Sequence, residues 1–329
     1  MLLGQQGVEV MTDDLHNIEL VARRLLSGKV VPVLGAGANL GYRPPDAGYQ
    51  PGVYLPSGSE LAEMLAKYVN YPEADVLDLA RVSQYVAARL GEGPLYEKLH
   101  KVFDADFPPT LLHRFLARLA RHTRKAVARG TEAAGECLLL VTTNYDDALE
   151  RAFRAEGEPY DLITYINDVE ESRGRFRHIP HDGESSVIWK PNEYADLPLD
   201  RWTIIAKIHG AVSRRAGGPD SFVITEDDYV EYLTHADIEG LFPATLAQKI
   251  KESHFLFLGY SLRDWNFRVM LYRLWRKQKF KKFKSWAIEA NPDPVDVATW
   301  DERGVDILHV RVENFVAALE QRLPPPEAA

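Results

Sequence analysis

The chain has 329 residues, 46% of them hydrophobic, and its 48 acidic and 39 basic residues give a formal net charge of −9. A chain of this length and composition forms one large domain or two ordinary ones around a sizeable core, which excludes a disordered protein. The acidic balance excludes a general attraction to nucleic acid or to an anionic membrane.

Cysteine content and hydropathy indicate the compartment. Cys137 is the only cysteine, which excludes an intrachain disulfide and a four-cysteine zinc site. The sequence contains neither a signal-peptide pattern nor an apolar run of about 18 residues. We therefore expect a soluble, cytoplasmic protein.

The first part of the chain is predicted to be mainly helical. An amphipathic helix over 13–28 precedes a short buried strand, KVVPVLGAG, over 29–37. Ser57 and Glu60 then have the spacing of a capping box, which marks the start of the next helix. Amphipathic patterns continue from there and predict a helical block over about 57–128, inserted in the sheet-forming core.

Strand signals return after this block, most of them separated by helical stretches. They lie in LLLVTTN (138–144), TIIAKIHG (203–210), SFVIT (221–225), HFLFLGYS (254–261), SWAIEA (285–290) and VDILHVRV (305–312). The alternation predicts an α/β fold, with a Rossmann-like, mostly parallel sheet and helices on both faces. The segment over about 156–199 is rich in glycine, proline and charge, and we expect it to be an irregular excursion within a single domain over 1–329.

Polar residues crowd the end of the second predicted strand, where TTNYDD (142–147) leads into a helical pattern. In an open α/β sheet, ligands usually bind at such strand ends. The alternative is structural: Thr142 or Asn144 caps the helix, and Asp146 and Asp147 complement its dipole.

Three further strand ends carry glycine or a potential base. Gly35, Gly37 and Gly41 follow the first strand, with a spacing one residue longer than the dinucleotide-binding fingerprint. His209, before Gly210, is either a structural histidine or a proton acceptor. Gly259 follows a fourth strand, and together the four strand ends suggest one nucleotide-sized site along one edge of the sheet.

The motifs GAGAN, TTNYD, IHG and GYS, in this order, resemble the sirtuin (SIR2) family, and the similarity is greatest to the SIR2-like domains of bacterial anti-phage defence proteins. The resemblance covers roughly residues 28 to 290. It implies a sirtuin-like fold that binds NAD and breaks the bond between nicotinamide and ribose.

The resemblance also implies roles for individual residues. Around the diphosphate it places the cofactor-binding residues Gly35, Ala36, Gly37, Asn39, Gly259 and Ser261, with Thr143 beside them at the glutamine position of the family motif. Asn144 would hold the nicotinamide ribose or the attacking water, and Asp146 would face the carboxamide. His209 would be the general base.

Departures from the family pattern indicate which molecule, water or a protein side chain, accepts the ADP-ribosyl group. Deacylase sirtuins carry four zinc-binding cysteines, whereas this chain has one cysteine; Thr143 replaces the family's glutamine and Asn39 its serine. We therefore expect an NAD+ hydrolase (NADase) that releases nicotinamide and ADP-ribose, needs no metal, and depletes NAD in anti-phage defence by abortive infection. The alternatives are an NAD or ADP-ribose sensor without catalysis, and a protein deacylase or ADP-ribosyltransferase. A dehydrogenase fits least, because Glu60, the only acid at a suitable distance, has a capping role.

Regulation is expected to come from other chains, because the catalytic fold uses almost the whole sequence. We predict a homo-oligomer or a separately encoded partner; in the family such partners include HerA-type ATPases and Argonaute-like proteins. The basic run Arg273 to Lys284 is either a contact surface or the solvated end of a helix.

Two smaller features remain open. His178 and His181 have a spacing that a metal could use, but an exposed loop is the favoured interpretation because no other ligands lie nearby in the sequence. Arg43 and Asp46 lie where sirtuins have a mobile loop over the cofactor.

Overall fold

The computed structural model describes residues 12–41, 43–44, 46–72, 77–130, 135–214, 218–234, 242–260 and 284–323. Ser261 and the basic run from 273 to 283 lie outside these residues. Within the described residues, no helix is both long enough and apolar enough to cross a membrane.

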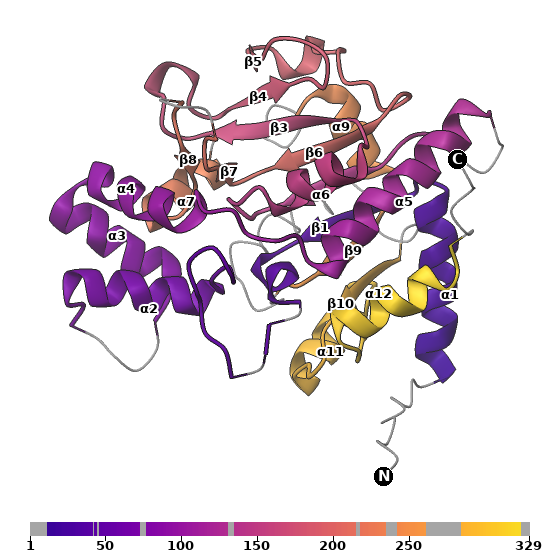
Figure 1. Ribbon diagram of the computed structural model, residues 1–329, viewed down its shortest axis with the longest axis horizontal. Helices are drawn as coiled ribbons and strands as arrows, with labels where there is room; N and C mark the ends of the chain where they lie inside the picture. Colours follow the sequence, from indigo (N-terminus) through magenta and orange to yellow (C-terminus); the bar gives the residue numbers. More distant parts are fainter. Residues whose placement is uncertain are drawn as a thin grey trace.

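A nine-stranded sheet forms the centre of the described structure, in the order β11-β10-β9-β1-β2-β6-β3-β4-β5 (Figure 1). Its strands are β1 (Val30–Leu34), β2 (Leu139–Thr142), β3 (Tyr160–Ile166), β4 (Arg175–Ile179), β5 (Ser186–Ile188), β6 (Thr203–Lys207), β9 (His254–Leu258), β10 (Ser285–Ile288) and β11 (Val305–Leu308). The strands from β11 to β3 are all parallel; β4 alone runs the opposite way, and it pairs antiparallel with β3 on one side and with β5 on the other. The predicted mostly parallel α/β sheet is confirmed.

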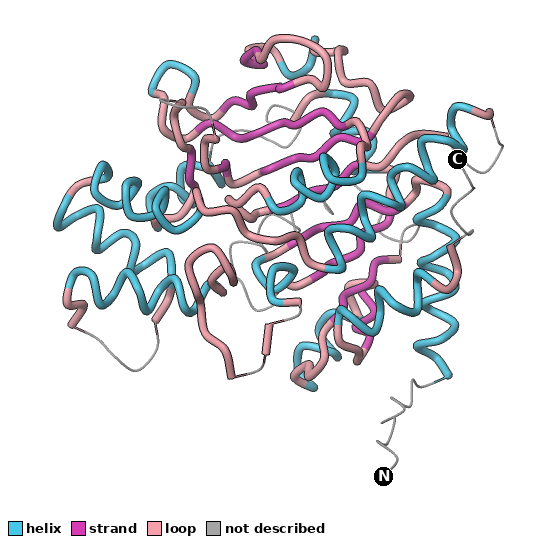
Figure 2. The backbone as a smooth tube through the Cα atoms, viewed as in Figure 1, coloured by secondary structure: helices cyan, strands magenta, loops and turns pink. Residues whose placement is uncertain are grey.

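Helices cover both faces of this sheet (Figure 2). The helices are α1 (Thr12–Leu26), α2 (Gly58–Val69), α3 (Leu79–Leu90), α4 (Glu92–Phe103), α5 (Leu111–Ala128), α6 (Ala148–Glu156), α7 (Glu226–Thr234), α9 (Ala244–Lys251), α11 (Pro294–Asp301) and α12 (Val312–Glu320). Short 3-10 helices η1 (Ala36–Leu40), η2 (Glu170–Ser172) and η3 (Pro191–Glu193), and a two-stranded ribbon of β7 (Gly210–Ala211) and β8 (Ser221–Phe222), complete the elements.

Alternate residues of the central strands supply two separate cores. Val31 and Val33 of β1 pack with residues of α9 and with Trp300 of α11 on one face. Val30 and Leu34 pack with residues of α1, α5, α6 and α12 on the other. Because both faces are covered, the central strands are buried along their whole length, which explains their continuous apolar runs.

The helical stretch between β1 and β2 divides into two parts in space. Helix α5 packs on the sheet with α6 and α12, whereas α2, α3 and α4 form a separate layer beyond the strand ends (Figure 1). This layer has its own core, which Tyr145 joins from the sheet side. The Tyr145 ring meets Phe103 and Phe222 edge to face, with ring centroids 5.4 and 5.1 Å away. The predicted capping box of Ser57 and Glu60 is present at the start of α2.

The structure differs from the sequence expectation over 156–199. Instead of an irregular excursion, this segment supplies β3, β4 and β5, the end of the sheet. On β3 and β4, buried residues alternate with half-exposed ones, so one face of this part of the sheet lacks a full helical cover. A short strand with one open face tolerates polar residues, and its apolar pattern is therefore weak in the sequence.

A buried polar cluster also weakens the apolar strand pattern of β3 and β4. Both ring nitrogens of His178 are hydrogen-bonded: Nε2 lies 2.8 Å from the Asp161 carboxylate, and Nδ1 lies 2.6 Å from the Tyr194 hydroxyl. The second Asp161 oxygen accepts from the Trp202 indole at 2.7 Å and from the His181 backbone N–H at 2.8 Å. The favoured interpretation of an exposed loop is therefore wrong for His178, which lies buried on β4. No group of three metal-ligating side chains occurs among the residues that the structure describes.

Asp161→Ala should destabilise the protein by about 3 kcal/mol, because it leaves several buried donors without an acceptor. Burial alone would raise the pKa of Asp161, but the bonds from His178, His181 and Trp202 outweigh it and hold the pKa below its ordinary value. A lowered carboxyl pKa gives stability above the unfolded-state pKa, and this stability is lost as pH falls through the folded-state pKa. The difference between wild type and variant in urea unfolding should therefore shrink in acid, below about pH 4.

Asp182→Ala, next to His181 in the loop after β4 but with a side chain 78% exposed, is the matched control and should unfold like wild type. Equal stability of Asp161→Ala and Asp182→Ala near neutral pH would contradict the role given to this cluster.

Candidate functional site

A cavity of about 760 Å³ opens at the carboxyl edge of the sheet, where β1, β2, β6 and β9 end. Its lining contains every predicted site residue that the structure describes: Gly35, Ala36, Gly37, Asn39, Thr143, Asn144, Asp146, His209 and Gly259. Four segments far apart in the sequence thus meet in one space, as expected for a topological switch point of a parallel sheet.

The glycines pack backbone against backbone. A Cβ on Gly35 or Gly37 would lie 2.7 or 2.8 Å from the carbonyl oxygen of Gly259, and a Cβ on Gly259 would lie 2.0 Å from the Ala38 nitrogen. The Gly37 N–H donates to the Gly259 carbonyl at 2.8 Å. Gly259 also has φ +66°, a conformation that favours glycine. These glycines are therefore required by the contact between the β1 and β9 loops before any ligand is considered.

The polar residues after β2 have separate tasks. The Thr142 hydroxyl donates to the Leu34 carbonyl at 3.1 Å and accepts from the Asn144 N–H at 3.0 Å. The Asn144 side-chain amide donates to the Gly35 carbonyl at 3.0 Å, so it bridges to the glycine loop. Neither residue caps α6, and the capping alternative is wrong for both.

Asp147 is the N-cap residue of α6 and makes no capping hydrogen bond with its side chain, whereas Asp146, just before it, binds both the first turn of α6 and Asn39. One carboxylate oxygen accepts from the Ala148 N–H at 3.0 Å, and the other accepts from the Asn39 side-chain amide at 2.8 Å. The Asp146 residue is only 4% exposed. Its carboxylate therefore fixes the orientation of Asn39 within the cavity wall.

Lys207, which sequence analysis did not select, binds the backbone of the turn that contains Asp146. Its ammonium group is buried and donates to the Asp146 carbonyl and, at 2.9 Å, to the Glu150 carboxylate. The side chains of Lys207 and Glu150 are 1% and 5% exposed. The lysine inside the apolar run TIIAKIHG could have indicated a buried ion pair, since a lysine is almost never fully buried without a partner.

His209 sits deeper in the same wall and is 7% exposed. Its ring meets Tyr229 and Tyr232 edge to face, with centroids 5.4 and 5.6 Å away. Burial lowers the pKa of His209 to about 3, so the imidazole is neutral near physiological pH.

Residues that the sequence analysis missed complete the cavity. Tyr260 lines it, and its hydroxyl lies 2.8 Å from the Thr143 hydroxyl. Tyr229 and Phe103 contribute aromatic rings. Ser57 and Leu61 belong to the helical layer, so α2 forms part of the rim.

Arg43, predicted in a loop over the cofactor, is tied to α2 and is not part of the cavity lining. Its guanidinium binds the Glu60 carboxylate through two nitrogens, one of them at 2.7 Å. This contact lowers the pKa of Glu60 to about 2. Glu60 also accepts from the Ser57 and Tyr49 N–H groups, and its capping role is confirmed.

The sequence profile of the SIR2-like domain family matches residues 138–308, more than half of the chain. The chain belongs to the SIR2-like family. The matched region contains the strand ends that carry Asn144, His209 and Gly259, and the resemblance found from the motifs is confirmed.

Two curated relatives are similar to this SIR2-like chain. It is 27% identical to the NAD(+) hydrolase ThsA of Acinetobacter baumannii (strain 532279) over 228 residues, which are 68% of this chain and 37% of that protein. It is 24% identical to Defense-associated sirtuin 2 of Bacillus subtilis over 173 residues, which are 51% of this chain and 14% of that protein. The similarity thus spans well under half the length of either relative.

Lys207→Met should destabilise the SIR2-like fold by about 3–5 kcal/mol, because it leaves the Glu150 carboxylate buried without its cation. The double variant Lys207→Met/Glu150→Leu should recover most of this loss, since it removes both charges together. Urea unfolding of the two variants measures the difference.

Lys249→Met is the matched control, because Lys249 is also buried and ion-paired, 2.7 Å from Glu136. Its effect should be smaller, since the Glu136 side chain is 46% exposed and stays hydrated when the lysine is removed. A double variant no more stable than Lys207→Met would contradict the assignment.

Proposed function

We propose that this protein is an NAD+ hydrolase that cleaves the nicotinamide–ribose bond and depletes NAD in bacterial anti-phage defence. The observation that carries the proposal is the meeting of Asn144, Asp146 and a neutral His209 with the glycine loops in one cavity. The name of one relative, an NAD(+) hydrolase, and that of the other, a defence-associated sirtuin, support the same function.

The cavity suits a nucleotide in size and in lining. Its volume of about 760 Å³ lies within the range of ligand pockets, about 300–1,000 Å³. Gly35, Ala36 and Gly37 offer a backbone surface without bulky side chains to the diphosphate of NAD, and Gly259 lies against them. Asn39 and Thr143 add polar groups to the same wall, and we propose Ser261 as a further diphosphate contact.

The reaction needs stabilisation of charge rather than a metal. In NAD the nicotinamide nitrogen is positively charged, so it leaves as a neutral molecule with the electron pair of the broken C–N bond. The positive charge then develops on the ribosyl carbon and its ring oxygen. Asn144 would orient the ribose or the attacking water through its amide, and polar groups fixed in advance lower the cost of the charged transition state.

His209 would accept the proton that water loses as its oxygen bonds to the ribosyl carbon. The products are nicotinamide, ADP-ribose and a proton that passes to solvent. Asp146, whose carboxylate is occupied by Asn39 and Ala148, would act at the carboxamide side mainly by holding Asn39 in place.

Control of such an activity is part of the proposal. An enzyme that destroys NAD must be restrained until infection, and we propose that self-association or a separately encoded partner, such as a HerA-type ATPase or an Argonaute-like protein, provides the restraint. Light scattering of the purified protein, with NAD hydrolysis measured on the same sample, would test this. A monomer at full activity would contradict it.

Asn144→Ala and His209→Ala should each lower NAD hydrolysis strongly. We expect a loss of about 10²–10³-fold for Asn144→Ala and about 10²–10⁴-fold for His209→Ala, in line with the removal of a transition-state donor and of a general base. Nicotinamide and ADP-ribose are quantified from NAD by chromatography, with the protein alone and with candidate partners.

His254→Ala is the control, because His254 begins β9 at the opposite edge of the sheet. It should leave the rate unchanged. NAD that binds but is not cleaved by wild type in any assembly would favour an NAD sensor, and transfer of ADP-ribose or deacylation of an added peptide would favour a protein-modifying enzyme.

The pH dependence should show the lowered pKa of His209. A base must be neutral to accept a proton, and the pKa of about 3 keeps this imidazole neutral far below the ordinary histidine range. A histidine with a pKa of about 6.5 would lose roughly thirtyfold in neutral form by about pH 5. We expect kcat/KM to stay nearly constant from about pH 7 to about pH 5, and a steep fall with a midpoint near 6.5 would contradict the assignment.

A further inference from the structure

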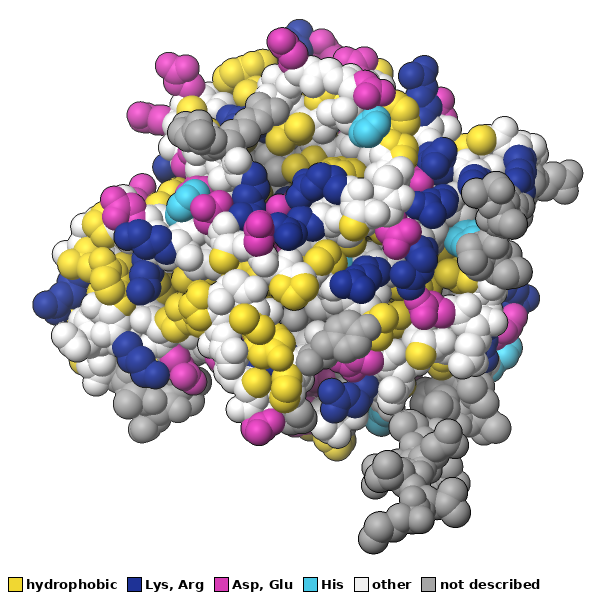
Figure 3. All heavy atoms as spheres, in the orientation of Figure 1, with side chains coloured by type: hydrophobic (Ala, Val, Ile, Leu, Met, Phe, Trp, Pro, Cys, Tyr) yellow, Lys and Arg dark blue, Asp and Glu magenta, His cyan; other side chains and the backbone are white. Residues whose placement is uncertain are grey.

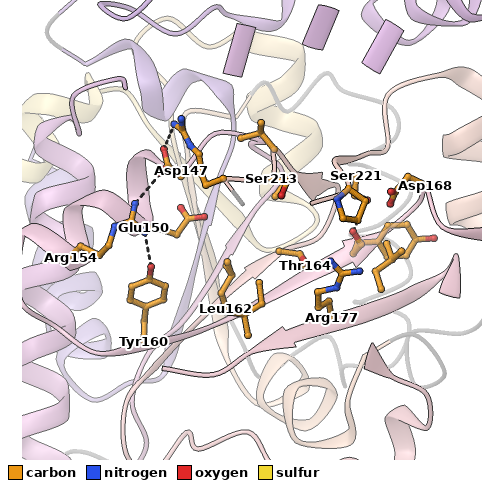
Figure 4. Close-up of a pocket in the computed structure, with 17 residues that line it drawn as sticks. Asp147, Glu150, Arg154, Tyr160, Leu162, Thr164, Asp168, Arg177, Ser213 and Ser221 are labelled. Atoms are coloured by element: carbon orange, nitrogen blue, oxygen red, sulfur yellow. Dashed lines mark hydrogen bonds and ion pairs between the residues drawn. The ribbon is translucent and has the colours of Figure 1, made fainter. Parts of the chain in front are cut away.

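A second cavity lies beside α6, where it adjoins the turn that carries Asp146. We call this space of about 180 Å³ the α6 pocket, and its walls include Asp147, Glu150, Arg154, Leu162, Thr164 and Arg177 (Figure 4). It forms because α6 covers the sheet only partly, leaving residues of β3 and β4 half-exposed. Leu162 and Thr164 form its floor, and Arg177 lies opposite Thr164 in the strand register.

The charges around the α6 pocket balance. Its lining contains three arginines and three carboxylates: Arg154, Arg177, Arg214, Asp147, Glu150 and Asp168. In the space-filling view, the same face shows basic and acidic side chains interspersed (Figure 3). A balanced lining gives no net attraction to a simple anion or cation, and it suits a ligand that carries both charges.

Two groups in the α6 pocket remain unused within the described structure. The Asp147 carboxylate is bound by Arg154 at 2.9 Å and by Arg214 at 2.6 Å. By contrast, the Glu150 Oε2 atom is buried with no hydrogen-bond partner among the described atoms, although Glu150 is only 4% exposed. Among the same residues, the Arg177 guanidinium makes no ion pair or hydrogen bond, and the nearby Asp168 acts on it only at longer range.

These two groups lie on opposite walls. Figure 4 shows the Glu150 carboxylate directed from α6 into the space above β3, while Arg177 rises from β4 on the other side. A buried acceptor without a donor is costly, whereas the half-exposed Arg177 is open to an anion from solvent. A molecule that brings a donor to Glu150 would remove this cost, and an acceptor on the same molecule would pair with Arg177.

We propose that the α6 pocket binds a small zwitterion, with its cationic group on Glu150 and its anionic group on Arg177. The cavity volume equals about six times the share of one water in the liquid, which suits a molecule of free amino acid size. The apolar floor of Leu162 would contact the uncharged part of the ligand.

Occupancy of the α6 pocket is linked to the larger cavity by a short chain of contacts. Glu150 binds Lys207, Lys207 binds the Asp146 carbonyl, and Asp146 binds Asn39 in the wall of the larger cavity. A ligand that binds Glu150 and shifts it therefore also shifts the turn at Asp146, which positions Asn39. This coupling to NAD rests on the proposed function, whereas the binding itself does not.

The test measures binding without requiring catalysis. The full chain is titrated, by thermal shift and calorimetry, with each common free amino acid. Each hit is repeated with its N-acetyl derivative, which lacks the cation, and with its carboxamide, which lacks the anion. We expect at least one zwitterion to raise Tm and to bind, and both derivatives of it to bind at least tenfold more weakly.

Variants distinguish the α6 pocket from other sites. Arg177→Gln and Glu150→Gln should each abolish the rise in Tm. Arg175→Gln should keep it, because Arg175 lies on the same half-exposed side of β4, two residues before Arg177. The proposal is overturned if no zwitterion binds, if the derivatives bind equally well, or if binding survives in Arg177→Gln.

The coupling is tested by measuring NAD affinity with and without the identified zwitterion. A change of at least threefold in wild type that is absent in Arg177→Gln supports the link, and by thermodynamic reciprocity NAD must then change the affinity of the zwitterion equally. Unchanged NAD affinity overturns the link. A protein that binds the zwitterion but never cleaves NAD would overturn the proposed function alone.

Discussion

The buried ammonium group of Lys207 is the interaction on which the candidate site depends. It joins the end of β6 to the turn after β2, because it binds the Asp146 carbonyl and the Glu150 carboxylate together. The Asp146 carboxylate then reaches Asn39 after β1. Three strand ends are thus locked by charge and hydrogen bonds in a place where little water can compete.

The glycine contacts provide the complementary constraint. The β1 and β9 loops approach so closely that a Cβ on Gly35, Gly37 or Gly259 would strike the backbone. This approach leaves a smooth backbone surface at the cavity and brings Tyr260 over Thr143. The same close packing serves stability and a ligand surface, so the glycines need not be explained by ligand binding alone.

Tyr145 shows how one short segment serves both the fold and the site. Its neighbours Asn144 and Asp146 line the cavity, while its ring packs into the core of the helical layer and its hydroxyl donates to the Val223 carbonyl at 2.7 Å. The position of α2 at the rim is thereby coupled to the turn that carries the polar side chains. Movement of the helical layer would therefore shift the positions of Asn144 and Asp146.

The sequence by itself determined the parallel α/β fold, the family and the residues that meet in the cavity, because strand patterns and strand-end motifs are local. It could not show that the Asp146 carboxylate binds Asn39, or that Lys207 anchors the turn, since these contacts join residues far apart in the chain. It also missed β3, β4 and β5, whose open face and buried Asp161–His178 pair weaken the apolar alternation. Only the tertiary structure decides which polar groups find partners, because burial is a property of the packed chain.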